Sequence, residues 1–246
     1  MVPLITLTTD FGTGSPYVAA MKARLLAGCP GASLVDVSHS VASFDVRAGA
    51  FVLWAGTRDF PPGSVHLAVV DPGVGGPRRP LAIQVKGSWY VGPDNGLFGM
   101  VLDEAEEEEA AAATVVAHEL RRPPGASATF EGRDVFAPAA AALAAGAPVM
   151  DLGIPLEGAP ARLPVRPPSV LWVDSFGNLV TSLRPPVRGV RVAGREVRAV
   201  ARTYSEAPSG QPFFYVGSMG LIEVGMREAS AAHLLGAGPG APVEPL

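Results

Sequence analysis

The sequence predicts an α/β N-terminal domain, with a central mostly parallel sheet between helices, and a small all-β, barrel-like C-terminal domain. Apolar runs of strand length alternate with helix-length patterns up to about residue 150, as in α/β sheets. Residues 155–168 are rich in proline and can continue neither element. Short β-branched runs separated by turns follow. We therefore expect domains at residues 1–160 and 169–246, joined by a linker at 161–168.

The composition limits the class of protein. Of the 246 residues, 48% are hydrophobic and 17% charged, which allows a sizeable core and argues against disorder. The formal net charge of -4 argues against nucleic acid as a partner, and the single cysteine excludes a disulfide framework. No basic region precedes the first apolar run, and the longest uncharged stretch, residues 135–150, is too short to span a bilayer. We expect a cytoplasmic protein without a membrane partner.

The first elements follow from local signals. Strands are expected at residues 3–9, 33–37 and 65–70. Ser15 is the expected N-cap of a helix that has Pro16 at its first position. Asp45 is expected to cap a second helix.

The rest of the N-terminal domain is expected to contain a pair of strands, a helix, a solvated acidic tract, a further strand and an Ala-rich helix. These are placed at residues 81–85, 89–91, 97–102, 104–109, 114–117 and from 134 onward. Asp134 is the expected cap of the last helix, with Pro138 confined to its first turn.

In the C-terminal domain we expect six short strands and one terminal helix. The strands cover residues 170–173, 179–183, 187–192, 197–203, 213–216 and 221–224, and the helix covers residues 230–235.

Aspartates stand where three of the expected strands end. Asp10, Asp71 and Asp94 are each followed by glycine within two positions. Ligands of open α/β sheets collect at the carboxyl ends of the strands. The three aspartates therefore indicate a polar ligand site at that edge.

The glycine-rich stretch from Asp71 to Arg78 is the most informative loop. A carboxylate at the mouth of a buried strand is costly to desolvate without a partner, and this loop is short enough to bring Arg78 to it. The alternative is an ordinary strand cap with a surface salt bridge. The glycines could form an anion nest, but Asp71 would repel a phosphate there.

Several kinds of site are not indicated. The four histidines are scattered without ligand spacing, so no metal site is expected. No serine nucleophile elbow and no Walker loop are present. Among the remaining groups, Asp10 could accept both hydroxyls of a ribose, and Phe176 with Asn178 would suit a purine. An ordinary Asn-containing turn is the alternative for Asn178, and Ser218 and Glu223 belong to a similar turn between strands.

The ordered set of these motifs resembles the S-adenosyl-L-methionine (SAM) hydroxide adenosyltransferase family, the SAM hydrolases, which are relatives of the fluorinating and chlorinating SAM enzymes. The resemblance covers Leu4 to about Leu235. It rests on Thr8-Thr9-Asp10-Phe11-Gly12, Pro16-Tyr17-Val18, Val70-Asp71-Pro72-Gly73-Val74-Gly75, Gly92-Pro93-Asp94-Asn95-Gly96, Gly132-Arg133-Asp134, Asp174-Ser175-Phe176-Gly177-Asn178 and Gly217-Ser218.

The resemblance implies a homotrimer in which the substrate lies between one subunit's N-terminal domain and its neighbour's C-terminal domain. It implies hydrolysis of SAM to adenosine and L-methionine, with SAM as the substrate and no cofactor. Asp71 and Arg78 match two members of the family's water-handling set, and halide-using relatives have tyrosine at the position of Asp71. The implied substrate-binding residues are Asp10, Phe44, Phe176, Asn178, Ser218, Glu223 and Met226.

The chain departs from the family pattern where it bears on chemistry. The family's histidine before Gly-Arg-Asp is Glu131 here, Ser15 replaces an acidic residue, and the usual glycine turn reads Met226-Arg227-Glu228-Ala229. Our hypothesis is that Asp71 orients or deprotonates the attacking water and that Arg78 holds Asp71. Glu131 is a third catalytic candidate. Two alternatives remain, a non-catalytic adenosine or SAM sensor and a halide-dependent SAM transferase.

Overall fold

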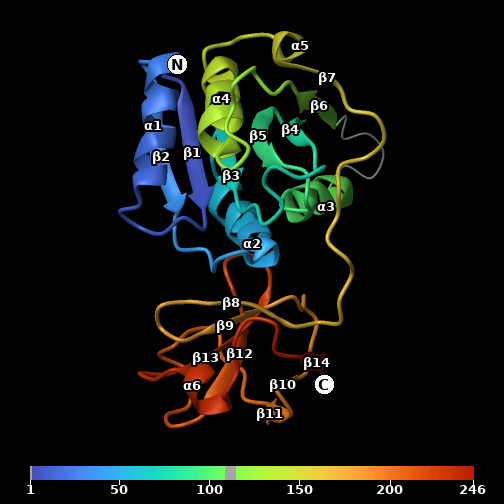
Figure 1. Ribbon diagram of the computed structural model, residues 1–246. Coiled ribbons are helices and arrows are strands. Elements are labelled where there is room, and N and C mark those ends of the chain that lie inside the picture. The colour runs from blue at the N-terminus through green and yellow to red at the C-terminus, as the bar shows by residue number, and fades with distance from the viewer. Residues whose placement is uncertain (1, 109–114) are drawn as a thin grey trace. The chain divides into compact units, whose positions relative to one another are not determined.

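The computed structural model describes residues 2–108 and 115–246, which form two compact units divided between Leu163 and Pro164 (Figure 1). Each unit has its own core. The end of the expected acidic tract at residue 109 and the start of the expected strand at residue 114 lie outside the described residues. No helix among the described residues is long and apolar enough to cross a membrane.

A seven-stranded mixed sheet forms the centre of the N-terminal unit, in the order β2-β1-β3-β5-β4-β6-β7. The strands are β1 (Leu4–Thr9), β2 (Ser33–Ser38), β3 (Val65–Val69), β4 (Pro80–Val85), β5 (Ser88–Pro93), β6 (Val116–Leu120) and β7 (Gly153–Pro155). The pairs β2-β1, β1-β3 and β3-β5 are parallel, and the other three neighbouring pairs are antiparallel. The parallel half therefore presents the ends of β1, β3 and β5 at one edge.

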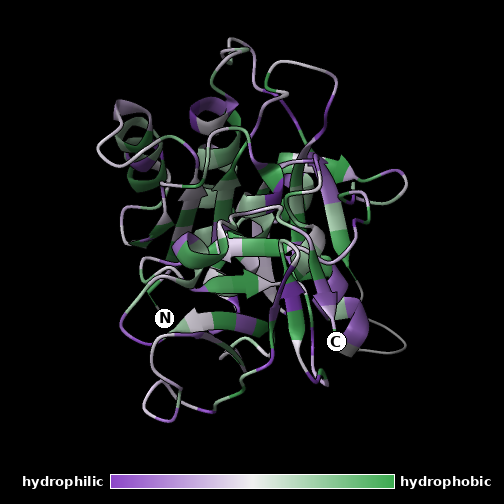
Figure 2. Ribbon diagram, turned by 90° about the horizontal axis from the view of Figure 1, so that it is seen from below, coloured by the Kyte–Doolittle hydropathy of each residue, from purple (hydrophilic) through white to green (hydrophobic). Residues whose placement is uncertain are grey.

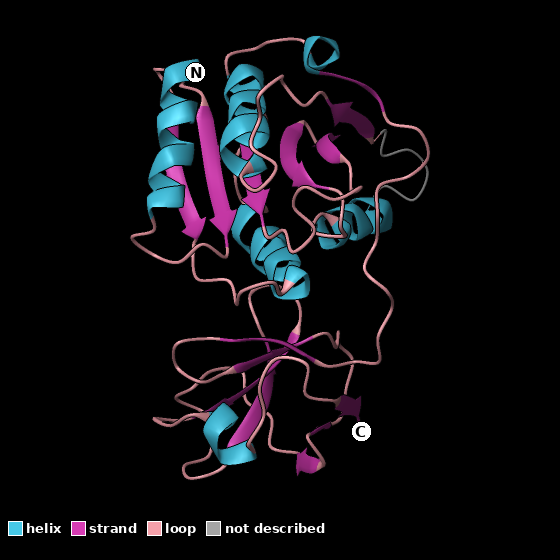
Figure 3. Cartoon of the chain, in the orientation of Figure 1, coloured by secondary structure: helices cyan, strands magenta, loops and turns pink. Residues whose placement is uncertain are grey.

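Helices cover both faces of this sheet (Figure 3). They are α1 (Pro16–Gly28), α2 (Val46–Thr57), α3 (Gly99–Glu108), α4 (Ala137–Ala144) and the short α5 (Val149–Leu152). Helix α1 packs against α4 on one face, and α2 packs against α3 on the other. The N-caps expected for α1 and α2 are confirmed, because Ser15 accepts from the Tyr17 N–H and Asp45 accepts from the Ala48 N–H.

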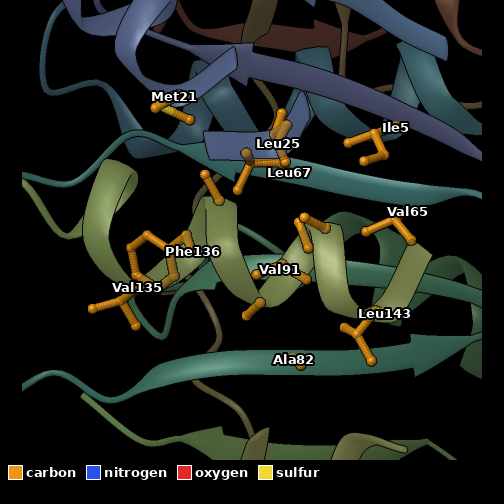
Figure 4. Packing of buried hydrophobic residues seen from close by; sticks show 14 of the residues in the cluster. Ile5, Met21, Leu25, Val65, Leu67, Ala82, Val91, Val135, Phe136 and Leu143 are labelled. Atoms are coloured by element: carbon orange, nitrogen blue, oxygen red, sulfur yellow. The ribbon is translucent and has the colours of Figure 1, made fainter. Parts of the chain in front are cut away.

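The larger core lies between the sheet and the helices α1 and α4 (Figure 4). Ile5 and Leu7 from β1, Leu25 from α1 and Phe136 from the start of α4 are fully buried there. Removing each such side chain from water stabilises the fold by about 1.5–3 kcal/mol. Strands and helices both carry hydrophobic colour in Figure 2, and the connecting loops are largely white or hydrophilic.

The helical segment that ends in α4 begins earlier than predicted. A π-helical turn, Gly132–Phe136, runs directly into α4, and Glu131 stands at its N-terminal end. Asp134 therefore lies inside the helical segment and does not cap it. Its carboxylate accepts from the Ser127 N–H at 3.0 Å and pairs with Arg133 instead. Single π turns of this kind occur often at functional sites.

The C-terminal unit is built from antiparallel strands in a four-stranded and a three-stranded sheet, with the orders β12-β13-β9-β8 and β11-β10-β14. The strands are β8 (Val170–Val173), β9 (Leu179–Thr181), β10 (Val190–Val192), β11 (Arg195–Val197), β12 (Pro212–Val216), β13 (Ile222–Met226) and β14 (Val243–Pro245). Helix α6 (Ala231–Leu235) begins after its N-cap Ser230.

One expectation for this part of the chain is wrong. The strand expected at residues 197–203 ends at Val197. Val200 forms an isolated bridge to Phe214, and the chain then turns, where Glu206 accepts from the Arg202 N–H at 3.3 Å and Thr203 accepts from the Glu206 N–H at 3.4 Å. The first residues of the expected linker, 161–163, are held to the N-terminal unit, where the Ala161 N–H donates to Asp94 at 2.7 Å.

We predict that His66 makes the folding stability depend on pH. The side chain is 1% exposed, and burial lowers its pKa from 6.5 to about 4. Between these pH values the His66 side chain is protonated in the unfolded chain but not in the folded chain. Stability is therefore complete above pH 6.5 and falls toward pH 4 by up to about 1.4 kcal/mol per pH unit. Urea unfolding of the protein and of His66→Gln between pH 7.5 and 4.5 measures this slope, and equal slopes in the two proteins would contradict it.

Candidate active site

Asp10 and Asp71 lie at the same edge of the parallel strands, as predicted. Thr9 at the end of β1 pairs with Val69 at the end of β3, so Asp10 follows this pair by one residue and Asp71 by two. The Asp10 Oδ2 atom accepts from the Phe44 N–H at 2.9 Å. The Phe44 backbone is left-handed, with φ +67°, and its ring is 72% exposed. The structure thus brings Asp10 and the exposed Phe44 together.

The Asp94 carboxylate is bonded to other groups of the chain and is not free. It accepts from Arg79 Nε at 2.7 Å and from the Ala161 N–H at 2.7 Å. The next residue links the strand ends, because Asn95 Nδ2 donates to the Val70 carbonyl at 2.9 Å. Asp94 therefore fastens Ala161 to the sheet, and Asn95 holds the backbone that carries Asp71.

The Asp71–Arg78 loop folds back on itself and brings its two ends into contact. Arg78 Nε donates to both oxygens of Asp71 at 3.1 Å, and Arg78 Nη2 donates to Oδ2. The Asp71 side chain is 4% exposed, and the Arg78 side chain is 9% exposed. Burial alone would lower the pKa of Arg78, but the hydrogen bonds and charges of Asp71 and Glu131 outweigh it and raise that pKa. The guanidinium is therefore a permanent cation that holds the carboxylate by a fork.

Glu131 joins this pair from the beginning of the π turn. Its side chain is 4% exposed, and its Oε2 atom lies 2.5 Å from Arg78 Nη1. The other oxygen, Oε1, accepts from Arg122 Nε at 2.7 Å. Arg122 follows β6, and its Nη2 also donates to the Arg78 carbonyl at 2.9 Å. Arg122 was not predicted from the sequence.

An aromatic cluster connects the segments that carry Asp10 and Glu131. Phe11 and Phe130 have ring centroids 6.1 Å apart, and Tyr17 lies 5.2 Å from Phe130 in an edge-to-face arrangement. Edge-to-face pairs of this kind add about 0.5–1.5 kcal/mol beyond their burial. The cluster therefore holds the segments of Asp10 and Glu131 in one region, although these two residues are far apart in the sequence.

We predict that Gly75→Ala destabilises the Asp71–Arg78 loop. Gly75 has φ +76°, and a Cβ atom there would lie 2.5 Å from the Ala128 carbonyl oxygen. The strain and the contact together are expected to lower the free energy of unfolding by at least about 1 kcal/mol. Gly73→Ala is the matched control, since its Cβ would meet nothing closer than 3.5 Å. Thermal unfolding measures both variants, and equal melting temperatures would contradict the prediction.

A separate cavity of about 690 Å³ lies within the C-terminal unit. It is lined by Asp174, Phe176, Asn178, Tyr204, Tyr215, Met226, Glu228, Ala229 and Ser230. Three of the predicted binding residues are among them, namely Phe176, Asn178 and Met226. Ser218 is exposed on the turn between β12 and β13, and Glu223 is buried behind the cavity wall.

Asp174 organises the turn that presents Asn178. Its Oδ1 atom accepts from the N–H groups of Phe176 and Asn178 at 2.9 and 2.8 Å, and its Oδ2 accepts from Asn178 Nδ2 at 2.7 Å. Only the amide nitrogen can donate to a carboxylate, which fixes the orientation of the Asn178 amide. Asn178 Oδ1 is then a buried acceptor without a hydrogen-bond partner among the described residues. The Tyr204 hydroxyl lies near this amide and bonds Tyr215 at 2.9 Å.

Tyr204 and Tyr215 in the cavity wall form a chain of hydrogen bonds with Glu223. The Tyr215 hydroxyl donates to Glu223 Oε2 at 2.7 Å. Burial raises the pKa of Glu223, and the charge of Asp174 raises it further, whereas the bond from Tyr215 opposes this shift. The two tyrosines were not predicted, because nothing in their local sequence marks them as partners of Glu223.

No group of three or more His, Cys, Asp or Glu side chains in residues 2–108 and 115–246 could hold a metal ion. The polar groups at the sheet edge and in the C-terminal cavity are carboxylates, arginines, an amide and hydroxyls. Such groups suit a polar organic ligand with hydroxyl and amine donors.

Fold and site together define a two-unit protein. A mixed α/β unit carries a buried carboxylate–arginine cluster, and an all-β unit carries an aromatic and amide cavity. The family model described as the SAM hydroxide adenosyltransferase N-terminal domain matches residues 5–153, and the model of the C-terminal domain matches residues 168–244. This chain belongs to the SAM hydroxide adenosyltransferase family.

Individual relatives agree with this assignment. The chain is 45% identical to the (R)-S-adenosyl-L-methionine hydrolase of Thermus thermophilus, covering 96% of each protein. It is 28% identical to the fluorinase of Actinopolyspora mzabensis, covering 94% of this chain and 93% of that one. A crystal structure of a conserved protein from Thermotoga maritima superposes with a TM-score of 0.87 at 32% identity, covering 98% of this chain and 99% of that one.

Proposed function

We propose that this protein hydrolyses SAM to adenosine and L-methionine by in-line attack of water on the ribose 5′ carbon. The observation that carries the proposal is the buried Asp71–Arg78 pair at the carboxyl edge of the parallel strands, next to Asp10. Membership of the family and the name of the Thermus relative support the same reaction.

In this proposal the sulfonium is already a good leaving group, so no acid is needed. The water oxygen forms a bond to the 5′ carbon, the carbon–sulfur bond breaks, and its electron pair leaves with methionine. Asp71 orients the water and takes up its proton. Arg78 donates twice to Oδ2 and once to Oδ1, so Oδ1 keeps a further lone pair for the water. Alignment of one water in a closed site supplies much of the rate.

The binding roles are proposed from both units. Asp10 binds the ribose hydroxyls beside the exposed ring of Phe44. Phe176 and Asn178 bind the adenine, because the unpartnered Asn178 Oδ1 suits its exocyclic amine. Met226 lines the same cavity, and Ser218 binds the methionine end. Glu223 contributes through Tyr215, with which it is hydrogen-bonded.

The stereochemistry of the sulfonium is part of the proposal. The Thermus relative is named for the (R) epimer of SAM. We propose that this protein also consumes the (R) epimer, and separate incubation with each epimer tests this. Consumption of the (S) epimer alone would contradict it.

One assay separates the proposed function from the alternatives. Purified protein is incubated with SAM, with and without chloride, and the products are identified. Adenosine formed without chloride supports hydrolysis, whereas a 5′-halo nucleoside would indicate the transferase. Binding without turnover would indicate the sensor.

The homotrimer and the cytoplasmic location implied by the resemblance belong to the same proposal, and light scattering of the purified protein tests the trimer.

A further inference from the structure

We propose that Arg122 is a positioning residue of this reaction. Its guanidinium balances the negative charge of Glu131. The guanidinium of Arg78 can therefore keep its hydrogen bonds to Asp71. This inference rests on the proposed hydrolysis and concerns the same site.

The two arginines bind different oxygens of Glu131. Arg122 Nε donates to Oε1 at 2.7 Å, and Arg78 Nη1 lies 2.5 Å from Oε2. The Nε and Nη2 atoms of Arg78 remain on Asp71. Arg122 therefore shares the charge of Glu131 with Arg78, which also holds Asp71.

The charges explain why the second arginine is needed. Asp71 and Glu131 are both 4% exposed, and Arg78 alone could balance only one of them. A buried charge without a partner is strongly destabilising. Arg122 supplies the second positive charge, so the four-residue cluster is neutral. An imidazole at position 131, as the family resemblance leads one to expect, could be neutral and would need no second cation.

Arg122 also contacts the loop itself. Its Nη2 donates to the Arg78 carbonyl at 2.9 Å, so one side chain holds both the beginning of the π turn and the end of the Asp71–Arg78 loop. Without Arg122, Glu131 would draw Arg78 away from Asp71. The carboxylate proposed to orient the water would then lose its fixed position.

Arg122→Gln is expected to lower kcat by roughly 10- to 100-fold, with little change in KM, because a small displacement of a reacting group costs this much in rate. Arg121→Gln is the matched control. The Arg121 guanidinium donates to the Asp151 carbonyl at 3.1 Å, outside this cluster, and its loss is expected to leave kcat unchanged. Arg122→Lys is expected to restore part of the loss by restoring the charge.

The decisive variant is Arg122→Gln combined with Glu131→Gln. This pair removes more contacts than Arg122→Gln alone but restores the charge balance, so kcat is expected to rise above that of the single variant. A purely structural role would lower kcat further, and that result would overturn the inference, as would an unchanged kcat in Arg122→Gln. Unfolding of both single variants and the double variant must show coupling between the two positions, and additive effects would also overturn it. Failure of the unmodified protein to form adenosine would instead contradict the proposed function.

Discussion

Asp71→Asn is expected to lower kcat for SAM by roughly 10²- to 10⁴-fold, the usual contribution of a positioned acid or base. Asparagine keeps the shape of the side chain but removes the charge that faces Arg78. It also presents one acceptor in place of two, so the water loses its proton acceptor and its orientation. Adenosine formation under saturating SAM measures the change.

Asp151→Asn provides the matched control, because it makes the same chemical change at an exposed position in α5. Circular dichroism of both variants checks that each remains folded. If Asp71→Asn turned over SAM at the rate of the control, Asp71 would have no part in the reaction. Asp71 would then be a salt-bridged strand cap.

Asn178→Ala is expected to weaken adenosine binding by roughly 10- to 100-fold, the equivalent of one lost hydrogen bond in a buried site. The Asn178 Oδ1 atom is a buried acceptor without a partner among the described residues, and its amide nitrogen is already engaged by Asp174. The exocyclic amine of adenine is the donor that we assign to it. Calorimetric titration with adenosine measures the loss.

Purine riboside, which lacks that amine, serves as the matched ligand. The unmodified protein is expected to bind it more weakly than adenosine, and Asn178→Ala is expected to bind the two alike. An equal fall in affinity for both ligands would show that Asn178 acts only through the shape of its turn.

Local sequence signals were sufficient where one segment determines its own structure. Ser15 and Asp45 were recognisable as N-caps, and Asp10 and Asp71 as residues at strand ends. The contact of Asp71 with Arg78 followed from a short loop with several glycines. Strands of three residues, such as β7 and β14, carry too few positions to show a pattern.

Contacts between distant segments were not recognisable in the same way. Arg122 meets the Arg78 carbonyl across 44 positions of sequence, and Asp94 meets the Ala161 N–H across 67. Such pairs depend on how strands and loops pack, which no periodicity in the chain records. The same holds for Glu131, whose two arginine partners decide whether it can act as a base or only as a partner in ion pairs.

The π turn at Gly132–Phe136 sets the direction in which Glu131 points. A π turn holds about one residue more than an α turn, and one residue of an α-helix corresponds to a rotation of roughly 100°. Deleting a single residue within Gly132–Phe136 would allow a regular helix and would also turn Glu131 away from both arginines. The chain thus keeps an irregular helix at the point where a regular one would carry its acidic residue out of the charge cluster.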